Sequence, residues 1–290
     1  MPRWGRPASH EALRSAAVTG TALDGYERTT FSHDGKERAV YRRGTGPAVV
    51  VIAEIPGITP KVVEFADRVA GIGCTAVLPH LFGEPGRDPF AGGGRLGSVR
   101  YALSSLVPTC ISREFTVLAT GRTSPVIDWL RALAAAEHQR CGGPGVGAVG
   151  MCFTGGFALA MATSPTLLAP VLSQPSLPFG PTVKWRRTID ISEADLGVVK
   201  QRCAAEGLEV LGLRFTGDRL VPSERFEFLR DELGDAFVAV ELDDADANPA
   251  SQMPPHSVLT EHLIDEPGQA TLAALDQVLD LFRRKLLAAG

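Results

Sequence analysis

The chain has 290 residues, which is enough for one large α/β domain with extensions. Its net charge is -4 and no lysine- or arginine-rich block stands out, which argues against a nucleic acid or a membrane surface as partner. The N-terminus lacks an apolar secretory segment, and no apolar run is long enough to cross a membrane. These features predict a cytoplasmic protein whose partner is a small molecule, and they carry no signal for an oligomeric state.

The first predicted elements are a hairpin and a βαβ unit. Residues 26–44 predict two strands joined at Asp34-Gly35, a dipeptide that favours a tight turn. Residues 48–54 and 74–79 are continuous apolar runs, typical of strands buried on both faces. The segment between these runs, 60–73, has helical periodicity and ends in glycine.

The alternation of strand and helix continues along the chain. Further strands are predicted at 146–151, 167–173, 209–217 and 236–242, and further helices at 124–140, 153–163, 192–207, 223–234 and 268–289. This order indicates a mostly parallel sheet with helices on both faces, preceded by the N-terminal β-hairpin. We expect residues 25–290 to form a single domain after an extension over residues 1–24. Two exposed loops, 83–98 and 173–190, are expected to overhang the carboxyl ends of the strands, where ligands bind.

Three glycines, Gly145, Gly147 and Gly150, match the spacing of a dinucleotide-binding fingerprint. In a true fingerprint the glycines follow the strand and open the helix, and an acidic residue follows about 20 positions later. Here the glycines lie within the predicted strand, and no aspartate or glutamate occurs between Glu137 and Asp190. The pattern therefore argues against a nicotinamide cofactor.

The segment 150–156, GMCFTGG, lies where this strand meets the next helix. A nucleophile elbow needs small residues around its nucleophile, because the sharp turn brings backbone close to backbone. The glycines at both ends of the segment supply that space, and the helix directs free amide groups at Cys152. Cys152 is therefore a candidate nucleophile, although a free cysteine is more often a core residue.

A nucleophile of this kind needs a base, and the base needs an acid that orients it. Asp218 follows the strand predicted at 209–217, and His256 lies in a proline-bounded loop after the next strand. Each residue alone is equally compatible with a surface loop. Together they follow Cys152 in the chain order nucleophile, acid, histidine that enzymes with a nucleophile elbow use.

Other groups compete for these roles. Asp243, Asp244 and Asp246 follow the last strand and could orient the histidine, although such a cluster is more often a solvated loop. His262 lies close to His256 in sequence. No set of ligands has the spacing of a metal site, so no metal is expected. The remaining cysteines lack CxxC spacing and are expected to be core thiols: Cys74, Cys110, Cys141 and Cys203.

Four motifs resemble those of the dienelactone hydrolases, which are α/β-hydrolases with a Cys-Asp-His triad. They are AEIPGI at 53–58, GMCFTGG at 150–156, TGDRLVP at 216–222 and PHSV at 255–258. By the order and spacing of the motifs, the resemblance covers roughly residues 40 to 285. It implies the α/β-hydrolase fold and a reaction that requires no cofactor.

The resemblance also implies a role for each residue of the triad. Cys152 would be the nucleophile, and Asp218 would orient the imidazole of His256. His256 would first act as the base and then as the acid that protonates the leaving group.

The glutamate in the first motif, Glu54, has a role in the same family. It would interact with the thiol in the resting enzyme and take part in forming the thiolate when substrate binds. A carboxylate at the end of a buried strand is costly without a partner or a function, although Glu54 could instead reach water at an edge. The amides of Ile55 and Phe153 would form the oxyanion hole.

Three features depart from the family pattern. Thr154 stands where the best-known members have glycine, so we expect a slightly different turn. The stretch between Cys152 and Asp218 is longer, so residues 173–190 could reshape the mouth of the pocket. The arginines that bind a lactone carboxylate are missing from the matching positions, which hold Glu84 and Thr260; candidates to replace them are Arg87, Arg95 and Arg219.

The sequence therefore predicts a carboxylic ester hydrolase that cleaves an ester or lactone through an acyl-enzyme on Cys152. An acyl transferase with the same triad is an alternative, because only the group that attacks the acyl-enzyme differs. A catalytically inert binding protein with the same fold is a second alternative, and a redox-sensing role for Cys152 is a third. Dienelactone itself is not the expected substrate, because the matching arginines are missing.

Overall fold

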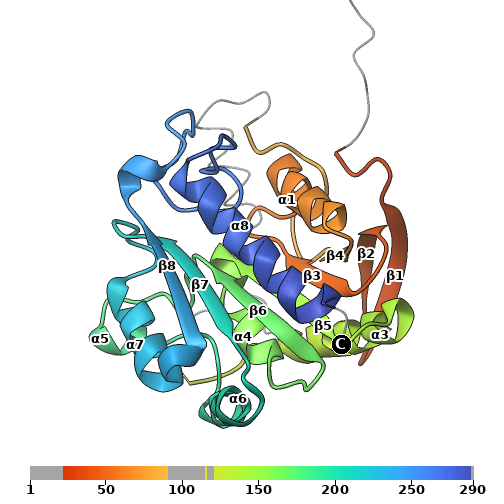
Figure 1. Cartoon of the computed structure of the whole chain (residues 1–290), viewed down its shortest axis with the longest axis horizontal. Helices are drawn as coiled ribbons and strands as arrows, with labels where there is room; N and C mark the ends of the chain where they lie inside the picture. The colour runs from red at the N-terminus through yellow and green to blue at the C-terminus, as the bar shows by residue number, and fades with distance from the viewer. Residues whose placement is uncertain (1–21, 91–114, 116–120, 289–290) are drawn as a thin grey trace, which may run out of the picture.

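The computed structural model describes residues 22–90, 115 and 121–288. An eight-stranded sheet runs through this part of the chain in the order β1-β2-β4-β3-β5-β6-β7-β8 (Figure 1). The strands are β1 (Glu27–His33), β2 (Lys36–Gly44), β3 (Ala48–Ile52), β4 (Thr75–Pro79), β5 (Val146–Met151), β6 (Leu167–Ser173), β7 (Val210–Phe215) and β8 (Phe237–Leu242).

The sheet is antiparallel at one edge and parallel elsewhere. β1 and β2 pair as the predicted hairpin, with Asp34 and Gly35 both at positive φ in the turn, and β2 pairs antiparallel with β4. From β4 to β8 all neighbouring strands are parallel. The carboxyl ends of these strands therefore lie along one rim of the sheet.

Helices cover both faces of the sheet, as the alternating pattern predicts. α1 and α8 pack with one apolar cluster, and α3, α4, α6 and α7 pack with the other (Figure 1). Their bounds are α1 (Pro60–Gly71), α3 (Val126–Cys141), α4 (Phe157–Met161), α5 (Val183–Arg186), α6 (Glu193–Glu206), α7 (Ser223–Leu233) and α8 (Ala270–Phe282). Within the described ranges, none of the helices has the length and apolar character needed to cross a bilayer.

The two apolar clusters explain why the central strands are uniformly apolar. Successive side chains of a strand point to opposite faces. In β3, Val49 and Val51 join the cluster under α1 and α8, whereas Val50 and Ile52 join the cluster on the opposite face. All five residues of β3 are fully buried. The fold is thus the predicted α/β-hydrolase fold.

Two segments differ from the expectations. The helix predicted at 153–163 begins as a short 3-10 turn, η1 (Cys152–Thr154), and becomes α-helical only at α4. Residues 173–178, expected in an exposed loop, are buried. One reason is Arg225 of α7, which is itself buried and donates hydrogen bonds to carbonyl oxygens of this segment, including those of Pro175 and Pro178. Of the loop expected at 83–98, residues 91–98 lie outside the described ranges.

Candidate active site

Cys152 lies on a sharp turn directly after β5, with a φ of 53°. This left-handed conformation is uncommon for a residue with a side chain and occurs often at functional sites. A Cβ atom on Gly150 would lie 2.0 Å from the carbonyl oxygen of Thr154, and one on Gly155 would lie 2.4 Å from the Cα atom of Pro175. Since neither position has room for a side chain, the turn requires glycine at both.

Thr154 fixes this turn to the neighbouring strand. Its hydroxyl group accepts a hydrogen bond from the amide of Met151 at 3.0 Å and donates one to the carbonyl oxygen of Ile52 at 2.8 Å. Thr154 is fully buried, and Ile52 is the last residue of β3. The threonine that departs from the family pattern therefore ties the turn of Cys152 to the strand that leads to Glu54.

His256 and Asp218 form a buried pair. The Nδ1 atom of His256 lies 2.6 Å from Oδ2 of Asp218, while Oδ1 of Asp218 accepts a hydrogen bond from the amide of Leu220 at 2.9 Å. The carboxylate is thus fixed in orientation and in turn orients the imidazole. Burial lowers the pKa of His256, but Cys152 and Asp218 outweigh this effect and raise that pKa well above its ordinary value.

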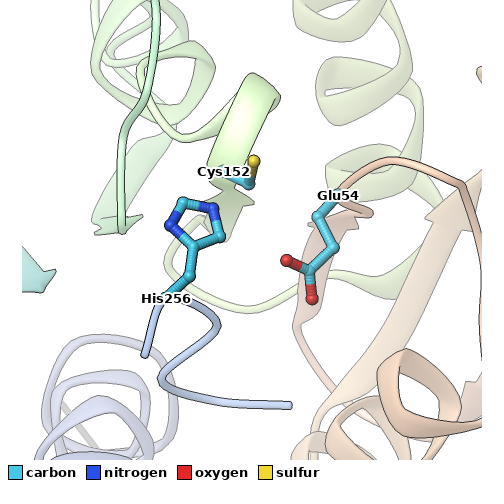
Figure 2. Close-up of side chains that lie close together, drawn as sticks. All are labelled: Glu54, Cys152 and His256. Carbon is cyan, nitrogen blue, oxygen red and sulfur yellow. The ribbon is translucent and has the colours of Figure 1, made fainter. Parts of the chain in front are cut away.

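Figure 2 shows Cys152, His256 and Glu54 converging from three separate segments. The sulfur of Cys152, a ring nitrogen of His256 and a carboxylate oxygen of Glu54 all lie within 4.8 Å of one another. The sulfur also lies 3.5 Å from the hydroxyl group of Ser176. Nε2 of His256 is buried and has no hydrogen-bond partner in the part of the chain that the structure describes. This nitrogen can therefore exchange a proton with a group placed beside it.

Glu54 is buried and held by three side chains. Ser257 donates a hydrogen bond to Oε2 at 2.6 Å, Gln174 donates another to the same atom at 3.3 Å, and Thr260 donates to Oε1. Only 6% of Glu54 is exposed, so the alternative of an edge residue that reaches water is wrong. The three donors stabilise a charged carboxylate at this depth.

His262 organises the loop that carries His256. Its Nδ1 atom accepts a hydrogen bond from the amide of Ser257 at 3.1 Å, and its Nε2 atom lies 3.2 Å from the carbonyl oxygen of Met253. These partners require a neutral ring with the proton on Nε2. Burial is the main cause that lowers the pKa of His262, which agrees with this neutral form.

A cavity of about 500 Å³ opens beside Cys152. His256 and Glu54 line it together with Ile55 and Phe153, the residues whose amides were expected to bind an oxyanion. Three of the predicted site residues, Cys152, His256 and Glu54, therefore line one cavity, and Asp218 lies behind His256, 2.6 Å from its Nδ1 atom.

The competing acids have other partners. Asp244 accepts a hydrogen bond from the amide of Gly217 at 2.9 Å, and Asp246 accepts one from the amide of Asp243 at 3.1 Å. These carboxylates shape the loop after β8 instead of orienting His256.

The other cysteines that the structure describes are free thiols. Burial raises the pKa of Cys74 to about 11 and also raises that of Cys203, which makes both thiols poor nucleophiles at neutral pH. Cys110 lies outside the described ranges.

The two candidate arginines that the structure describes, Arg87 and Arg219, do not line the cavity. Arg87 pairs with Glu84 at 2.9 Å, and Arg219 lines a separate cavity beside Trp185. Arg95 lies outside the described ranges. The missing family arginines thus have no replacement among the described residues that line this cavity.

Glu54, Cys152 and His256 also form a group of possible metal ligands. The sequence predicts no metal site, because these residues are far apart in the chain and have no ligand spacing. The structure brings them together through the sheet topology.

The supporting roles of Gln174, Ser257 and His262 could not be predicted from the sequence, because they depend on contacts between distant segments. For Gln174 one signal was present, since it directly follows the carboxyl end of β6, where ligands bind.

The profile of the dienelactone hydrolase family matches residues 38–189, just over half of the 290 residues. A comparison with curated proteins found no match. Among solved structures, the chain is similar to a putative dienelactone hydrolase from Klebsiella pneumoniae subsp. pneumoniae, with 18% identity and a TM-score of 0.57 over 89% of this chain and 98% of that one.

Two further structures have the same fold. A dienelactone hydrolase-like promiscuous phosphotriesterase from metagenomic libraries is 17% identical, with a TM-score of 0.57 over 90% of this chain and 98% of that one. A dienelactone hydrolase from Anabaena variabilis is 15% identical, with a TM-score of 0.52 over the same shares. The profile match extends through β3, β5 and the turn of Cys152. Together with the α/β-hydrolase fold, this match shows that the chain belongs to the dienelactone hydrolase family of hydrolases.

Proposed function

We propose that this protein hydrolyses a carboxylic ester or lactone of a small molecule, with Cys152 as the nucleophile and His256 as its base. The observation that carries the proposal is that Asp218 is hydrogen-bonded to His256 and that a ring nitrogen of His256 lies within 4.8 Å of the sulfur of Cys152, beside a cavity. Each residue alone is common in proteins. In series they have the arrangement that nucleophilic catalysis requires.

The electrostatics support a protonated imidazole at His256. The pKa of His256 is lowered by burial, yet Cys152 and Asp218 raise it well above the ordinary value. When Nε2 accepts a proton from the sulfur, Asp218 stabilises the resulting imidazolium through its hydrogen bond to Nδ1. The carboxylate of Glu54 also lies within 4.8 Å of the sulfur, so it is close enough to act on the charge of the reacting group.

In the first step the thiolate attacks the carbonyl carbon, so a C–S bond forms and the carbonyl oxygen becomes an oxyanion. We assign the amides of Ile55 and Phe153 to this oxyanion, because both residues line the cavity next to Cys152. The bond between the carbonyl carbon and the leaving oxygen then breaks. The leaving oxygen takes the proton from Nε2 of His256, and a thioester remains on Cys152.

Water completes the reaction. His256 takes a proton from a water molecule while the water oxygen attacks the thioester carbon. The thiolate then leaves, and the carboxylic acid is released. Asp218 stabilises the imidazolium in both steps, since its carboxylate stays 2.6 Å from Nδ1.

The proposal is tested with a panel of aryl esters and lactones, assayed against wild type, Cys152→Ala and Cys152→Ser. We expect turnover by wild type and a loss of at least about 10³-fold in both variants, because the nucleophile is removed. Cys203→Ala is the matched control, since Cys203 is also partly buried but lies outside the cavity, and it should keep wild-type activity.

Mass spectrometry gives a second and independent readout. In His256→Asn, rapid quenching after addition of an aryl ester should reveal an acyl adduct on the peptide that contains Cys152, because water activation is lost. Undiminished hydrolysis by Cys152→Ala would contradict the proposal. Acyl transfer to an added alcohol in place of hydrolysis would redirect it to a transferase.

A further inference from the structure

The cavity beside Cys152 has the size of a site for a small organic molecule, about 500 Å³. Most of its wall is apolar. Six of the residues that line it are Ile55, Pro56, Phe90, Phe153, Phe179 and Leu220. Such a wall binds the hydrocarbon part of a substrate, so the few charged groups decide which polar groups are accepted.

The charged groups of this cavity are acidic, apart from the imidazole of His256. Among the described residues that line it, Glu54 and Glu261 are carboxylates, and none is a lysine or an arginine. Glu54 is already bound by three hydroxyl or amide donors. The carboxylate of Glu261 has no hydrogen bond or ion pair with any residue in the described ranges, and Glu261 is only half-buried. Its oxygens are therefore available to a ligand.

In the family pattern, an arginine that binds a substrate carboxylate stands shortly after the catalytic histidine. The matching position shortly after His256 holds Thr260, whose hydroxyl group donates to Glu54, and the next residue is Glu261. The cation that acts on Glu261, Lys61, already pairs with Glu64 at 2.7 Å. A substrate carboxylate at this place would meet a negative field, whereas an ammonium group or a neutral donor would be stabilised.

We propose that this cavity selects neutral or positively charged substrates over carboxylate-bearing ones, and that Glu261 determines this preference; the inference rests on the proposed hydrolase function of the same site. Burial first, and Glu54 next, raise the pKa of Glu261 to about 7. The preference should therefore increase as the pH rises through 7 and Glu261 ionises. The other charged groups that act on Glu261 are Lys61, Asp88 and Glu64.

The field at Cys152 can be measured without any ester. Methanethiosulfonate reagents of equal size carry either a trimethylammonium group or a sulfonate group, and both convert the thiolate to a mixed disulfide with release of methanesulfinate. The labelling rate of the trimethylammonium reagent is divided by that of the sulfonate reagent, and this ratio is divided by the same ratio for a small free thiol. The result reports the charge preference of the cavity. At pH 8 we expect this ratio to exceed 1 by about tenfold in wild type.

Four variants locate the effect. Glu261→Gln should lower the ratio severalfold, and Glu261→Arg should bring it below 1. Glu266→Gln is the matched control, because it removes one exposed carboxylate of the same segment outside the cavity and should keep the wild-type ratio. Cys152→Ala identifies the labelled thiol. In wild type, but not in Glu261→Gln, the ratio should rise between pH 6 and pH 8.5.

Matched 4-nitrophenyl esters of butyric acid, 4-aminobutyric acid and succinic acid then test the substrate class. We expect kcat/KM for the neutral and cationic esters to exceed that for the succinate monoester by about tenfold, and Glu261→Arg to reverse this order. Equal labelling ratios in wild type and Glu261→Gln would overturn the inference. A normal charge preference in labelling without any ester turnover would overturn the proposed function and leave the charge selectivity of the cavity standing.

Discussion

The hydroxyl group of Thr154 lies 2.8 Å from the carbonyl oxygen of Ile52, and this contact joins the turn of Cys152 to the end of β3. The same hydroxyl group accepts the amide proton of Met151. This buried side chain therefore adds to the pairing of β3 with β5 in setting the relative position of the thiol and of the backbone around Ile55. Glycine at position 154, as in the best-known family members, could not make this connection.

We predict that Thr154→Val lowers both stability and turnover. Valine keeps the shape but leaves the amide of Met151 and the carbonyl group of Ile52 without a partner, which costs about 1–3 kcal/mol of unfolding free energy. Because the turn also positions the thiol, kcat should fall by about tenfold while KM changes little. Thr154→Ser restores the hydroxyl group and should recover most of kcat. Equal kcat values for the valine and serine variants would contradict the positioning role.

A second prediction concerns the space at Gly150. A Cβ atom there would lie 2.0 Å from the backbone oxygen of Thr154, so Gly150→Ala must displace the turn and should cost about 3 kcal/mol or more. Gly197→Ala is the matched control, because Gly197 lies within α6 with nothing near its Cβ position. Alanine there should stabilise the protein by roughly 0.5–1 kcal/mol. Urea unfolding of the two variants gives both values, and a Gly150→Ala protein of wild-type stability would contradict the close approach.

The chain order of the candidate residues was enough to predict which strand ends carry them. Parallel strands put their carboxyl ends on one rim, so Cys152 after β5 and Asp218 after β7 had to lie on the same side of the sheet. The turn of Cys152 could be recognised because its glycines leave space that no other residue leaves.

The surroundings of Glu54 could not be predicted in this way. Its partners, Gln174, Ser257 and Thr260, are 120 to 206 residues away in the chain, and their contacts depend on the path of two irregular loops. Gln174 even has a positive φ of 36°, which no sequence pattern indicates for glutamine. The burial of residues 173–178 was missed for a similar reason, because the contacts that hold this segment come from distant parts of the chain, Arg225 among them.

A third prediction concerns how the free energy of unfolding changes at acidic pH. The pKa of His262 is lowered in the folded protein, mainly by burial, so the unfolded chain takes up this proton at a higher pH than the folded chain does. Its contribution to stability is therefore complete above about pH 6.5 and falls at lower pH, by at most about 1.4 kcal/mol per pH unit. His256 has the opposite sign, because its raised pKa favours the folded state below the ordinary histidine value and this contribution is lost at higher pH.

The variant His262→Gln separates the two histidines. Its side-chain oxygen can accept the amide proton of Ser257, as Nδ1 does in the wild type, but it does not titrate. Between pH 7 and pH 5.5, the free energy of unfolding should fall more steeply in wild type than in the variant. Urea unfolding at the two pH values gives these free energies. If the free energy of unfolding falls by the same amount in wild type and variant, His262 is not the group that destabilises the loop in acid.

The fourth prediction concerns Arg225, which holds the loop that brings Phe179 to the cavity. Burial lowers its pKa to about 10, so at neutral pH the guanidinium is charged but poorly solvated, and its hydrogen bonds must offset this cost. It donates to backbone carbonyl oxygens of one loop, including those of Pro175, Pro178 and Thr188. The same loop carries Ser176 and Phe179 to the site.

Arg225→Met should therefore do more than lower stability by about 3–5 kcal/mol, the cost of several buried carbonyl groups left without donors. It should also free the segment 179–188 for limited proteolysis and raise KM severalfold, because Phe179 loses its support. Arg230→Met on the same helix is the matched control, since Arg230 is exposed and its pair with Glu241 contributes at most about 1 kcal/mol. If both variants are cleaved at the same rate and keep the same KM, then packing around the loop, and not the arginine, holds the mouth of the cavity in place.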